Sequence, residues 1–426
     1  MEKPVSRESD RGIDVPAKRP GGYRVLHTAD WHLGKLLNDR SRDEEHRKFL
    51  EWLLLVVREH EVDAILLAGD VFDTANPPTG AQQRYFTFVA DLFRTTGCTL
   101  AVIGGNHDSA AHLDAPKYAL HALNVHVFGR LEEDYRSRFL LLPTAGNPQL
   151  AVAMVPFLRE RDLRVGKAGE GADVVRASIV AGIERVYRET AAVVPTLDAF
   201  ECPVIATGHL TVVGARSSDS ERDIHIGGLG AVSSAVFPEQ FSYVALGHLH
   251  RPQATDDAGR VRYAGSPIPL SFSESSDTKE VRVLDAFPDR IEQFSLPVPL
   301  FRRLAQIRTS ADHLEKTLLR FDPETRELPT WVEVVVEGET LSTDLNERVR
   351  KATGDRDFAV LKVVRERSAS RSVEDPDTLN DDEALDTLLD RPDEVFDRLL
   401  RDYPGVDTQQ GDRLRIAFRQ LLERTG

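Results

Sequence analysis

Apolar runs and amphipathic stretches alternate along the first two thirds of the chain. Short runs made almost entirely of apolar residues predict buried strands, since a strand in a sheet that is covered on both faces has no polar side. These runs are residues 23–28, 64–68, 100–103, 125–128, 139–142, 150–155, 204–207 and 243–246. Apolar residues spaced three and four apart predict helices at residues 43–60, 82–94 and 174–193.

The order of these elements predicts the fold class. Strands first alternate with helices and then come in clusters, and residues 280–287 and 291–294 predict a late hairpin. We therefore expect an α/β (α+β) domain at residues 23–296, built on a mixed sheet or a two-sheet sandwich flanked by helices. Residues 1–22 are polar, contain Pro and Gly and lack the apolar segment of a secretory signal, which predicts a disordered tail.

The pattern changes after a Pro-Val-Pro sequence at residues 297–299, which predicts a linker. Residues 301–367 then predict a small α+β domain, with strands at 304–307, 331–336 and 358–364 and helices at 310–320 and 343–351. Ser310 is the expected N-cap of the first of these helices. Residues 368–377 predict a second linker, and residues 378–426 predict helices that each have one apolar face.

The net charge of −15 argues at first against a nucleic-acid partner. Residues 373–412, however, hold fourteen acidic residues and three arginines, a local charge of −11 that leaves only −4 for the remainder. A polyanionic substrate on another face is therefore compatible with the composition. No apolar run approaches the roughly 20 residues that span a bilayer. Cys98 and Cys202 lie in apolar runs, and free thiols there fit a reducing cytoplasm.

Polar residues able to bind a metal follow five of the predicted strands. They are Asp30 and His32; Asp70; Asn106, His107 and Asp108; His209; and His248 and His250. A glycine precedes the first of them at four of the five strand ends, where it permits a sharp turn and close backbone approach. Because ligands gather beyond the carboxyl ends of strands in α/β folds, we expect these side chains to converge on one crevice.

The donor types indicate which ions would bind. The set has nitrogen and oxygen donors and no thiolate, and it is too large for one ion. It therefore predicts two divalent ions of the Mn, Fe or Zn kind, which a shared carboxylate would hold roughly 3.5–4 Å apart. Asp70, alone in its motif, is the candidate for that bridge.

Each motif taken alone has an ordinary structural explanation, since Asp and His are common in loops and Gly-Asp is common in turns. Two imidazoles at positions 248 and 250 rarely serve packing, and packing does not explain all five strand ends together. The other histidines lack this context, and we interpret them as ordinary surface or core residues. They are His27, His46, His60, His112, His121, His126, His225 and His313.

The ordered motifs resemble the calcineurin-like metallophosphoesterase superfamily, and their flanks resemble its SbcD family of bacterial double-strand-break repair nuclease subunits. The matching stretches are LHTADWHLGK at 26–35, GDVFD at 69–73, GNHDS at 105–109, HLTV at 209–212, GHLHRPQ at 247–253 and YAGSPIPLSFSE at 263–274. The resemblance covers roughly residues 23–285 and implies the two-sheet sandwich of that superfamily. The polar N-terminal tail is additional to the family pattern.

The resemblance also implies a role for each site residue. The first ion takes Asp30, His32, Asp70 and His250, and the second takes Asp70, Asn106, His209 and His248. His107 is then the imidazole that protonates the leaving oxygen, and Asp108 is expected to orient it. Mn²⁺ is the first choice of metal, with Mg²⁺ or Fe²⁺ as alternatives.

For the rest of the chain, the resemblance implies partners. Residues 301–367 resemble a capping domain that contacts DNA, with a dimerisation or purely structural lid as the alternative. The C-terminal helices are expected to bind the SbcC ATPase, or else to pack on their own nuclease domain. Helices near residues 82–94 and 113–123 are candidates for a homodimer contact.

The implied function is DNA hydrolysis in repair, recombination and replication, as an ATP-dependent double-strand exonuclease and a single-strand or hairpin endonuclease with SbcC. One alternative is a metallophosphoesterase acting on small-molecule or protein phosphoesters, which would share all five motifs. Another is a non-catalytic scaffold for the ATPase, which predicts missing ligands, whereas here every motif position is filled.

Overall fold

The computed structural model describes residues 15–144, 146–164, 172–197, 202–221, 231–324, 326–337, 345–354 and 356–366. The chain forms two compact units, residues 1–366 and residues 367–426. The second unit lies outside the described residues, so the helices expected at 378–426 stay a prediction.

The first sheet has six strands in the order β14-β13-β1-β4-β5-β6. Four neighbouring strands are parallel: β1 (Tyr23–Thr28), β4 (Ala64–Ala68), β5 (Thr99–Ile103) and β6 (Val125–Phe128). The predicted hairpin, β13 (Glu280–Phe287) and β14 (Arg290–Pro297), adds two antiparallel strands beside β1.

The second sheet also has six strands, in the order β11-β12-β10-β9-β8-β7. The parallel strands are β8 (Leu150–Ala153), β9 (Val204–His209), β10 (Tyr243–Gly247) and β12 (Val261–Tyr263). The antiparallel strands β7 (Phe139–Leu142) and β11 (Gln253–Ala254) form its edges. The carboxyl ends of β1, β4 and β5 in one sheet and of β9 and β10 in the other carry the predicted site residues.

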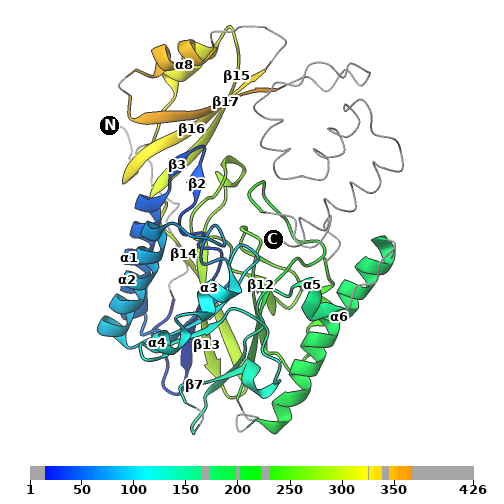
Figure 1. The fold of residues 1–426 in the computed structure, drawn as a ribbon. Helices are drawn as coiled ribbons and strands as arrows, with labels where there is room; N and C mark the ends of the chain where they lie inside the picture. Colours follow the sequence, from blue (N-terminus) through cyan, green and yellow to red (C-terminus); the bar gives the residue numbers. More distant parts are fainter. Residues whose placement is uncertain are drawn as a thin grey trace, which may run out of the picture. The chain divides into compact units, whose positions relative to one another are not determined.

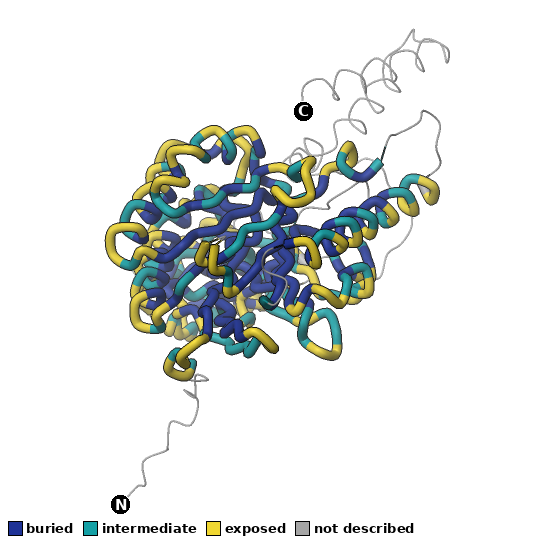
Figure 2. Tube along the Cα trace, turned by 90° about the horizontal axis from the view of Figure 1, so that it is seen from below, coloured by how far each residue is buried: buried dark blue, intermediate teal, exposed yellow. Residues whose placement is uncertain are grey.

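The two sheets pack face to face, which confirms the two-sheet sandwich flanked by helices. Residues that alternate along each strand divide between two cores: Val25 and Leu66 lie between the sheets, whereas Leu26 and Leu67 face the helices. Helices α1 (Asp43–Glu59) and α2 (Thr79–Thr96) cover the first sheet, and α6 (Ala172–Val193) covers the second (Figure 1). Figure 2 shows the strands buried beneath more exposed helices.

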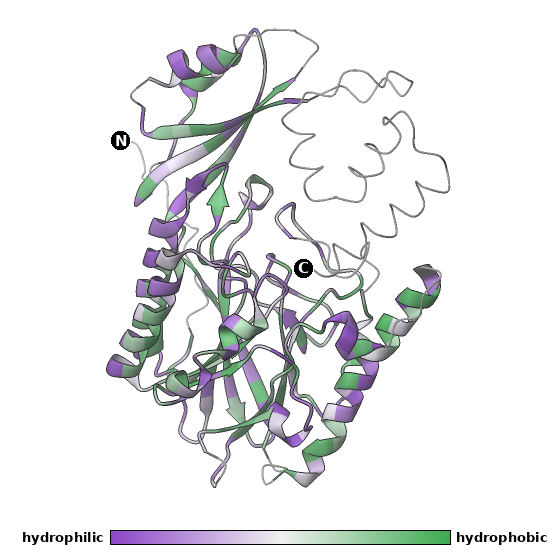
Figure 3. Cartoon of the chain, in the orientation of Figure 1, coloured by the Kyte–Doolittle hydropathy of each residue, from purple (hydrophilic) through white to green (hydrophobic). Residues whose placement is uncertain are grey.

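Local sequence explains how the flanking helices form. Helix α1 begins with three acidic residues, which stabilise the positive end of the helix dipole. Helix α2 ends at Gly97, whose φ of 68° gives the left-handed cap that often stops a helix. Hydrophilic and hydrophobic residues both occur along each long helix (Figure 3), as expected where one face packs on a sheet.

Residues 301–366 form a third, separate sheet. Strands β15 (Arg302–Ser310), β16 (Leu328–Glu337) and β17 (Phe358–Glu366) are parallel, and α7 (Leu314–Arg320) and α8 (Leu345–Thr353) connect them. Their apolar side chains form a core of their own. The small α+β domain therefore has its predicted elements within the same compact unit as the sandwich.

Two boundaries differ from the sequence expectation. Ser310 is the last residue of β15 and not a helix N-cap; α7 starts four residues later, after His313, because the strand continues to pair with β16. The disorder expected for residues 1–22 is not found at residues 15–22, since Lys18 pairs with Asp63 at 2.6 Å and the Pro16 carbonyl accepts a hydrogen bond from Arg24. Residues 1–14 lie outside the described residues.

Candidate metal centre

The predicted strand ends converge where the two sheets meet. The Nε2 atom of His209, after β9, lies 3.3 Å from the carboxylate of Asp70 after β4 and 2.9 Å from the amide oxygen of Asn106 after β5. His32, after β1, lies 3.5 Å from the same carboxylate group through its own Nε2. Asp70 thus lies between candidate ligands from both sheets.

The same residues form metal-sized clusters. Asp30, His32 and His250 offer donor atoms that all lie within 4.8 Å of one another, and so do Asp30, Asp70 and His209. The ring of His248 lies 5.4 Å from that of His209, and its backbone N–H donates to Asp30. All seven proposed ligands therefore belong to one connected group.

The imidazoles are oriented in a way that suits metal binding. The Nδ1 atoms of three ligands are each held by an oxygen: His32 by the Asp73 carboxylate at 3.1 Å, His209 by the Ala68 carbonyl at 2.9 Å and His250 by the Ser220 hydroxyl at 2.6 Å. Such contacts hold a proton on Nδ1, so that the Nε2 lone pair would be the one that faces a bound cation.

Two buried polar atoms test whether the residues fit a metal. Asp30 Oδ2 and His32 Nε2 are buried and have no hydrogen-bond partner among the described residues. A buried polar atom without a partner destabilises a fold unless another group satisfies it. A carboxylate oxygen and an imidazole nitrogen are both good donors to divalent ions of the Mn, Fe and Zn kind, so the site fits such ions.

The electrostatics of the protein groups lead to the same conclusion. Burial, reinforced by the adjacent Asp70 carboxylate, raises the pKa of Asp30 well above its usual range. Burial would also raise the pKa of Asp70, but the imidazoles of His209 and His32 hold it well below that range. Burial lowers the pKa of His209, and the Asp70 carboxylate more than offsets this and raises it to about 9. Two buried carboxylates so close together call for positive charge between them.

The backbone at the site adopts conformations that side chains rarely tolerate. Asp30, His32, Asp70 and His248 have φ values of 52°, 46°, 48° and 97°. Positive φ in residues other than glycine costs about 1–3 kcal/mol each and clusters at functional sites. These strained residues are all proposed ligands.

Glycines allow the strand ends to approach, as the sequence suggested. A Cβ atom at Gly105 would collide with the carboxylate and the backbone nitrogen of Asp70. A Cβ atom at Gly247 would collide with the Ala68 carbonyl, which itself holds His209. Glycine at these positions is therefore a requirement of the close packing of ligand loops.

Asp108 does not have the expected position relative to His107. Its carboxylate accepts the backbone N–H groups of Val71, Phe72 and Gly105 at 2.9–3.1 Å. The Nδ1 atom of His107 instead lies 2.7 Å from the carbonyl oxygen of Asp73. The prediction that Asp108 orients the imidazole is corrected: the Asp73 carbonyl holds His107 Nδ1, and Asp108 fixes two ligand loops to each other through the three backbone N–H groups that it accepts.

Asp73 is the residue that the sequence reasoning missed. Its carboxylate holds His32 and also pairs with Lys35 at 3.1 Å, while its carbonyl holds His107. The rings of His32 and His107 are 4.7 Å apart. Asp73 lies in the GDVFD motif but, unlike Asp70, needs the three-dimensional structure to show what it contacts.

Two parts of the chain match known protein families. Residues 23–252, which include every proposed ligand, match the calcineurin-like phosphoesterase family. Residues 300–403 match a family described as the type 5 capsule protein repressor C-terminal domain. The first match covers more than half of the chain.

Relatives resemble the chain over much of its length. The chain is 36% identical to the SbcD protein of the SbcCD nuclease of Escherichia coli K12, over 94% of this chain and 98% of that one. It is 43% identical to the protein of the same name from Rhodobacter capsulatus, over 66% and 72%, and 34% identical to that of Bacillus subtilis, over 77% and 83%. The chain therefore belongs to the SbcD family of nuclease subunits, within the calcineurin-like phosphoesterases.

Proposed function

We propose that this chain hydrolyses DNA phosphodiester bonds with two divalent metal ions. The observation that carries the proposal is the convergence of five strand ends on Asp70, with every ligand position of the family pattern filled. Membership of a nuclease-subunit family supports DNA as the substrate.

The ligand sets follow from the family pattern, and the cluster of Asp30, His32 and His250 supports the first of them. Asp30, His32, Asp70 and His250 would hold the first ion, and Asp70, Asn106, His209 and His248 the second. We propose Mn²⁺, with Mg²⁺ or Fe²⁺ as alternatives, since the donors are nitrogen and oxygen. When bound, the two ions supply Lewis acidity and a lowered pKa of water, as in other two-metal phosphoesterases.

His107 is the proposed general acid. The Asp73 carbonyl at 2.7 Å fixes the Nδ1 proton, so proton transfer takes place at Nε2. The side chain is only 5% exposed and its ring is beside that of the ligand His32. It can therefore protonate the departing ribose oxygen next to the metals, and no covalent intermediate with the protein is needed.

We further propose an SbcC-type ATPase as the partner, because the relatives are named as parts of SbcCD. The complex would act in the cytoplasm on breaks, as an ATP-dependent double-strand exonuclease and a single-strand or hairpin endonuclease. Residues 378–426 would bind the ATPase. Within the described residues, no helix is long and apolar enough to cross a membrane.

The basic residues of the capping domain differ in whether they form ion pairs, and this difference indicates which of them could contact DNA. Five of its basic residues form ion pairs with carboxylates: Arg302, Arg303, Arg326, Arg348 and Lys351. Lys316 and Arg320 instead line an open hollow on α7, beside His313. We propose this hollow as a place where the domain meets a DNA phosphate.

Exposed aromatic side chains support the proposed homodimer. Phe86 and Phe93 on α2 are 38% and 42% exposed, and Tyr118, in the second candidate segment, is 85% exposed. Aromatic residues are enriched at protein–protein interfaces relative to the rest of the surface.

The decisive experiment compares substrates. Release of nucleotides from end-labelled duplex and hairpin DNA is measured with Mn²⁺, with and without the ATPase partner and ATP. Hydrolysis of a small phosphodiester and of a phosphoprotein is measured beside it. The proposal predicts cleavage of DNA that ATP and the partner stimulate. Efficient hydrolysis of the small or protein substrates without any DNA cleavage would instead favour the alternative phosphoesterase function.

A further inference from the structure

A buried carboxylate–ammonium pair lies behind the ligand His250. Glu274, at the end of the 3₁₀ helix η5 (Phe272–Glu274), has no exposed surface, and Lys279 is 4% exposed. Their charged atoms are 2.6 Å apart. Neither residue belongs to a strand end of the metal site, and neither has a role in the proposed chemistry.

The pair holds His250 at two points. The Lys279 ammonium donates to the His250 carbonyl at 2.8 Å. The Ser220 hydroxyl is hydrogen-bonded both to His250 Nδ1, at 2.6 Å, and to Glu274 Oε1. Glu274 Oε1 is also 3.4 Å from His250 Nδ1.

The chemistry of these groups fixes the direction of the hydrogen bonds. A carboxylate can only accept, so Ser220 donates its single proton to Glu274. The Ser220 oxygen must then accept from His250, which places the proton on Nδ1 and leaves Nε2 unprotonated.

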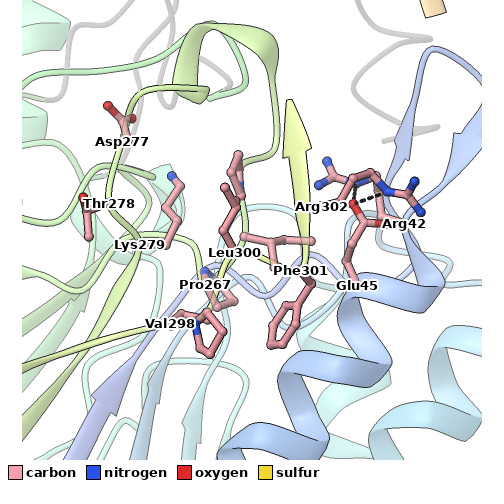
Figure 4. A pocket seen from close by; sticks show the side chains of 13 residues that line it. Arg42, Glu45, Pro267, Asp277, Thr278, Lys279, Val298, Leu300, Phe301 and Arg302 are labelled. Atoms are coloured by element: carbon pink, nitrogen blue, oxygen red, sulfur yellow. Dashed lines mark hydrogen bonds and ion pairs between the residues drawn. The ribbon is translucent and has the colours of Figure 1, made fainter. Parts of the chain in front are cut away.

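Lys279 explains how the charge of Glu274 can be buried. An unpaired carboxylate with no exposure would be strongly destabilising, whereas a paired and hydrogen-bonded one is tolerated. Lys279 also lines a cavity of about 160 Å³ (Figure 4), on the side opposite the cluster of Arg42, Glu45 and Arg302. Lys279 therefore contacts both this cavity and the backbone of His250.

We propose that Glu274 is a positioning residue for the metal ligand His250, acting through Ser220 and supported by Lys279. It selects the tautomer and the ring orientation in which Nε2 is available to the first ion. This inference rests on the proposed two-ion site. A purely structural role for Glu274, for example through its bond from the Leu270 N–H at 3.1 Å, would alter stability and leave metal affinity unchanged.

The test measures Mn²⁺ binding to the metal-free full chain by isothermal titration calorimetry. Wild type is expected to bind two ions. Glu274→Gln is expected to lower the affinity for one of these ions by about 10–100-fold, the usual effect of removing a group that orients a ligand. The affinity for the other ion should be unchanged. The matched control is Glu45→Gln: Glu45 is also buried and paired with a basic residue, Arg42 at 2.7 Å, but is hydrogen-bonded to none of the seven proposed ligands. It should not change either affinity.

Two milder variants test the relay even if Glu274→Gln folds poorly. Ser220→Ala removes the hydroxyl and leaves the Glu274–Lys279 pair intact, so that no buried charge loses its partner. It is expected to weaken binding of the same ion. Ser220→Thr keeps the hydroxyl and should restore binding to near the wild-type affinity. Unchanged affinities in both Glu274→Gln and Ser220→Ala, with wild type binding two ions, would overturn the positioning role alone. A wild-type chain that binds fewer than two ions would instead overturn the two-ion site itself.

Discussion

The sandwich at residues 23–296 and the capping domain at residues 301–366 differ in the polar groups that they bury. In the described part of the capping domain, the buried polar residues are Arg302, Thr309 and Thr330. In the sandwich they include all the imidazole and carboxylate side chains that we propose as metal ligands. Positive φ follows the same division, since Glu324 is the one residue other than glycine with positive φ among the described capping residues.

The difference shows what each region has to do. The capping domain buries Leu314, Leu318, Val332 and Val334 in an ordinary apolar core, which suffices to make a folded surface. The sandwich also builds large apolar cores, and these support strained backbone and buried charge at one edge. Substitutions in the two regions should therefore change different quantities, function at the ligand loops and stability in the capping core.

The largest expected effect is the loss of the proposed acid. His107→Leu is expected to reduce DNA cleavage by about 10²–10⁴-fold, because proton transfer to the leaving oxygen is lost. Mn²⁺ affinity should persist, since His107 is in neither ligand set. Initial rates on end-labelled duplex DNA measure the loss of cleavage, and calorimetric titration with Mn²⁺ measures the retained affinity. Cleavage at the wild-type rate would show that another group protonates the leaving oxygen.

Gly105→Ala should have the next largest effect, without removing any functional group. The added Cβ would displace Asp70, the proposed bridge, and a shift of about 1 Å in a catalytic group costs on the order of 10²-fold in rate. We expect weakened Mn²⁺ binding together with at least that loss of cleavage.

Gly354 in the capping domain is the matched control. A Cβ there meets no described atom within 4 Å, although its φ of 48° is left-handed. Gly354→Ala should cost only about 1–2 kcal/mol of stability and leave cleavage unchanged. Equal effects of the two substitutions on Mn²⁺ binding would contradict the division between the regions.

Leu318→Ala probes the capping core in the same way. Leu318 is fully buried, so its truncation should lower the free energy of unfolding by about 2–5 kcal/mol. Hydrolysis of a small phosphodiester should be unchanged at temperatures where the domain is folded. Urea denaturation and the hydrolysis assay measure the two quantities, and a loss of small-substrate hydrolysis in the folded variant would mean that the capping core supports the metal site.

The smallest expected effect concerns His27, which joins the two sheets through Tyr243 and the Leu246 carbonyl. Burial lowers its pKa from 6.5 to about 3. Between these values the unfolded chain binds the proton and the folded chain does not, so stability falls as pH decreases from 6.5 toward 3. His27→Gln should flatten this dependence by about 1.4 kcal/mol per pH unit, measured by urea denaturation between about pH 4 and 6. An unaltered slope would show that other groups cause the acid sensitivity.

Much of the fold and the convergence of the proposed ligands could be predicted from the sequence, because both depend on local pattern. Apolar runs set the strands, and Asp, Asn and His directly after them had to lie at the carboxyl ends of the sheets. The N-cap at Ser310 could not be placed correctly in this way. Pairing with β16 extends the strand through that residue, and pairing partners are distant in sequence.

The sequence by itself determined that a two-sheet phosphoesterase scaffold would carry Asp30, His32, Asp70, Asn106, His209, His248 and His250 at strand ends, with His107 beside them. Only the tertiary structure decided what holds those side chains in place. It gave the Asp73 carbonyl, not the Asp108 carboxylate, to His107, and it placed Glu274 and Lys279 behind His250. The physical reason is that strand periodicity fixes where a side chain begins, whereas its hydrogen-bond partners come from loops whose approach depends on the packing of both sheets.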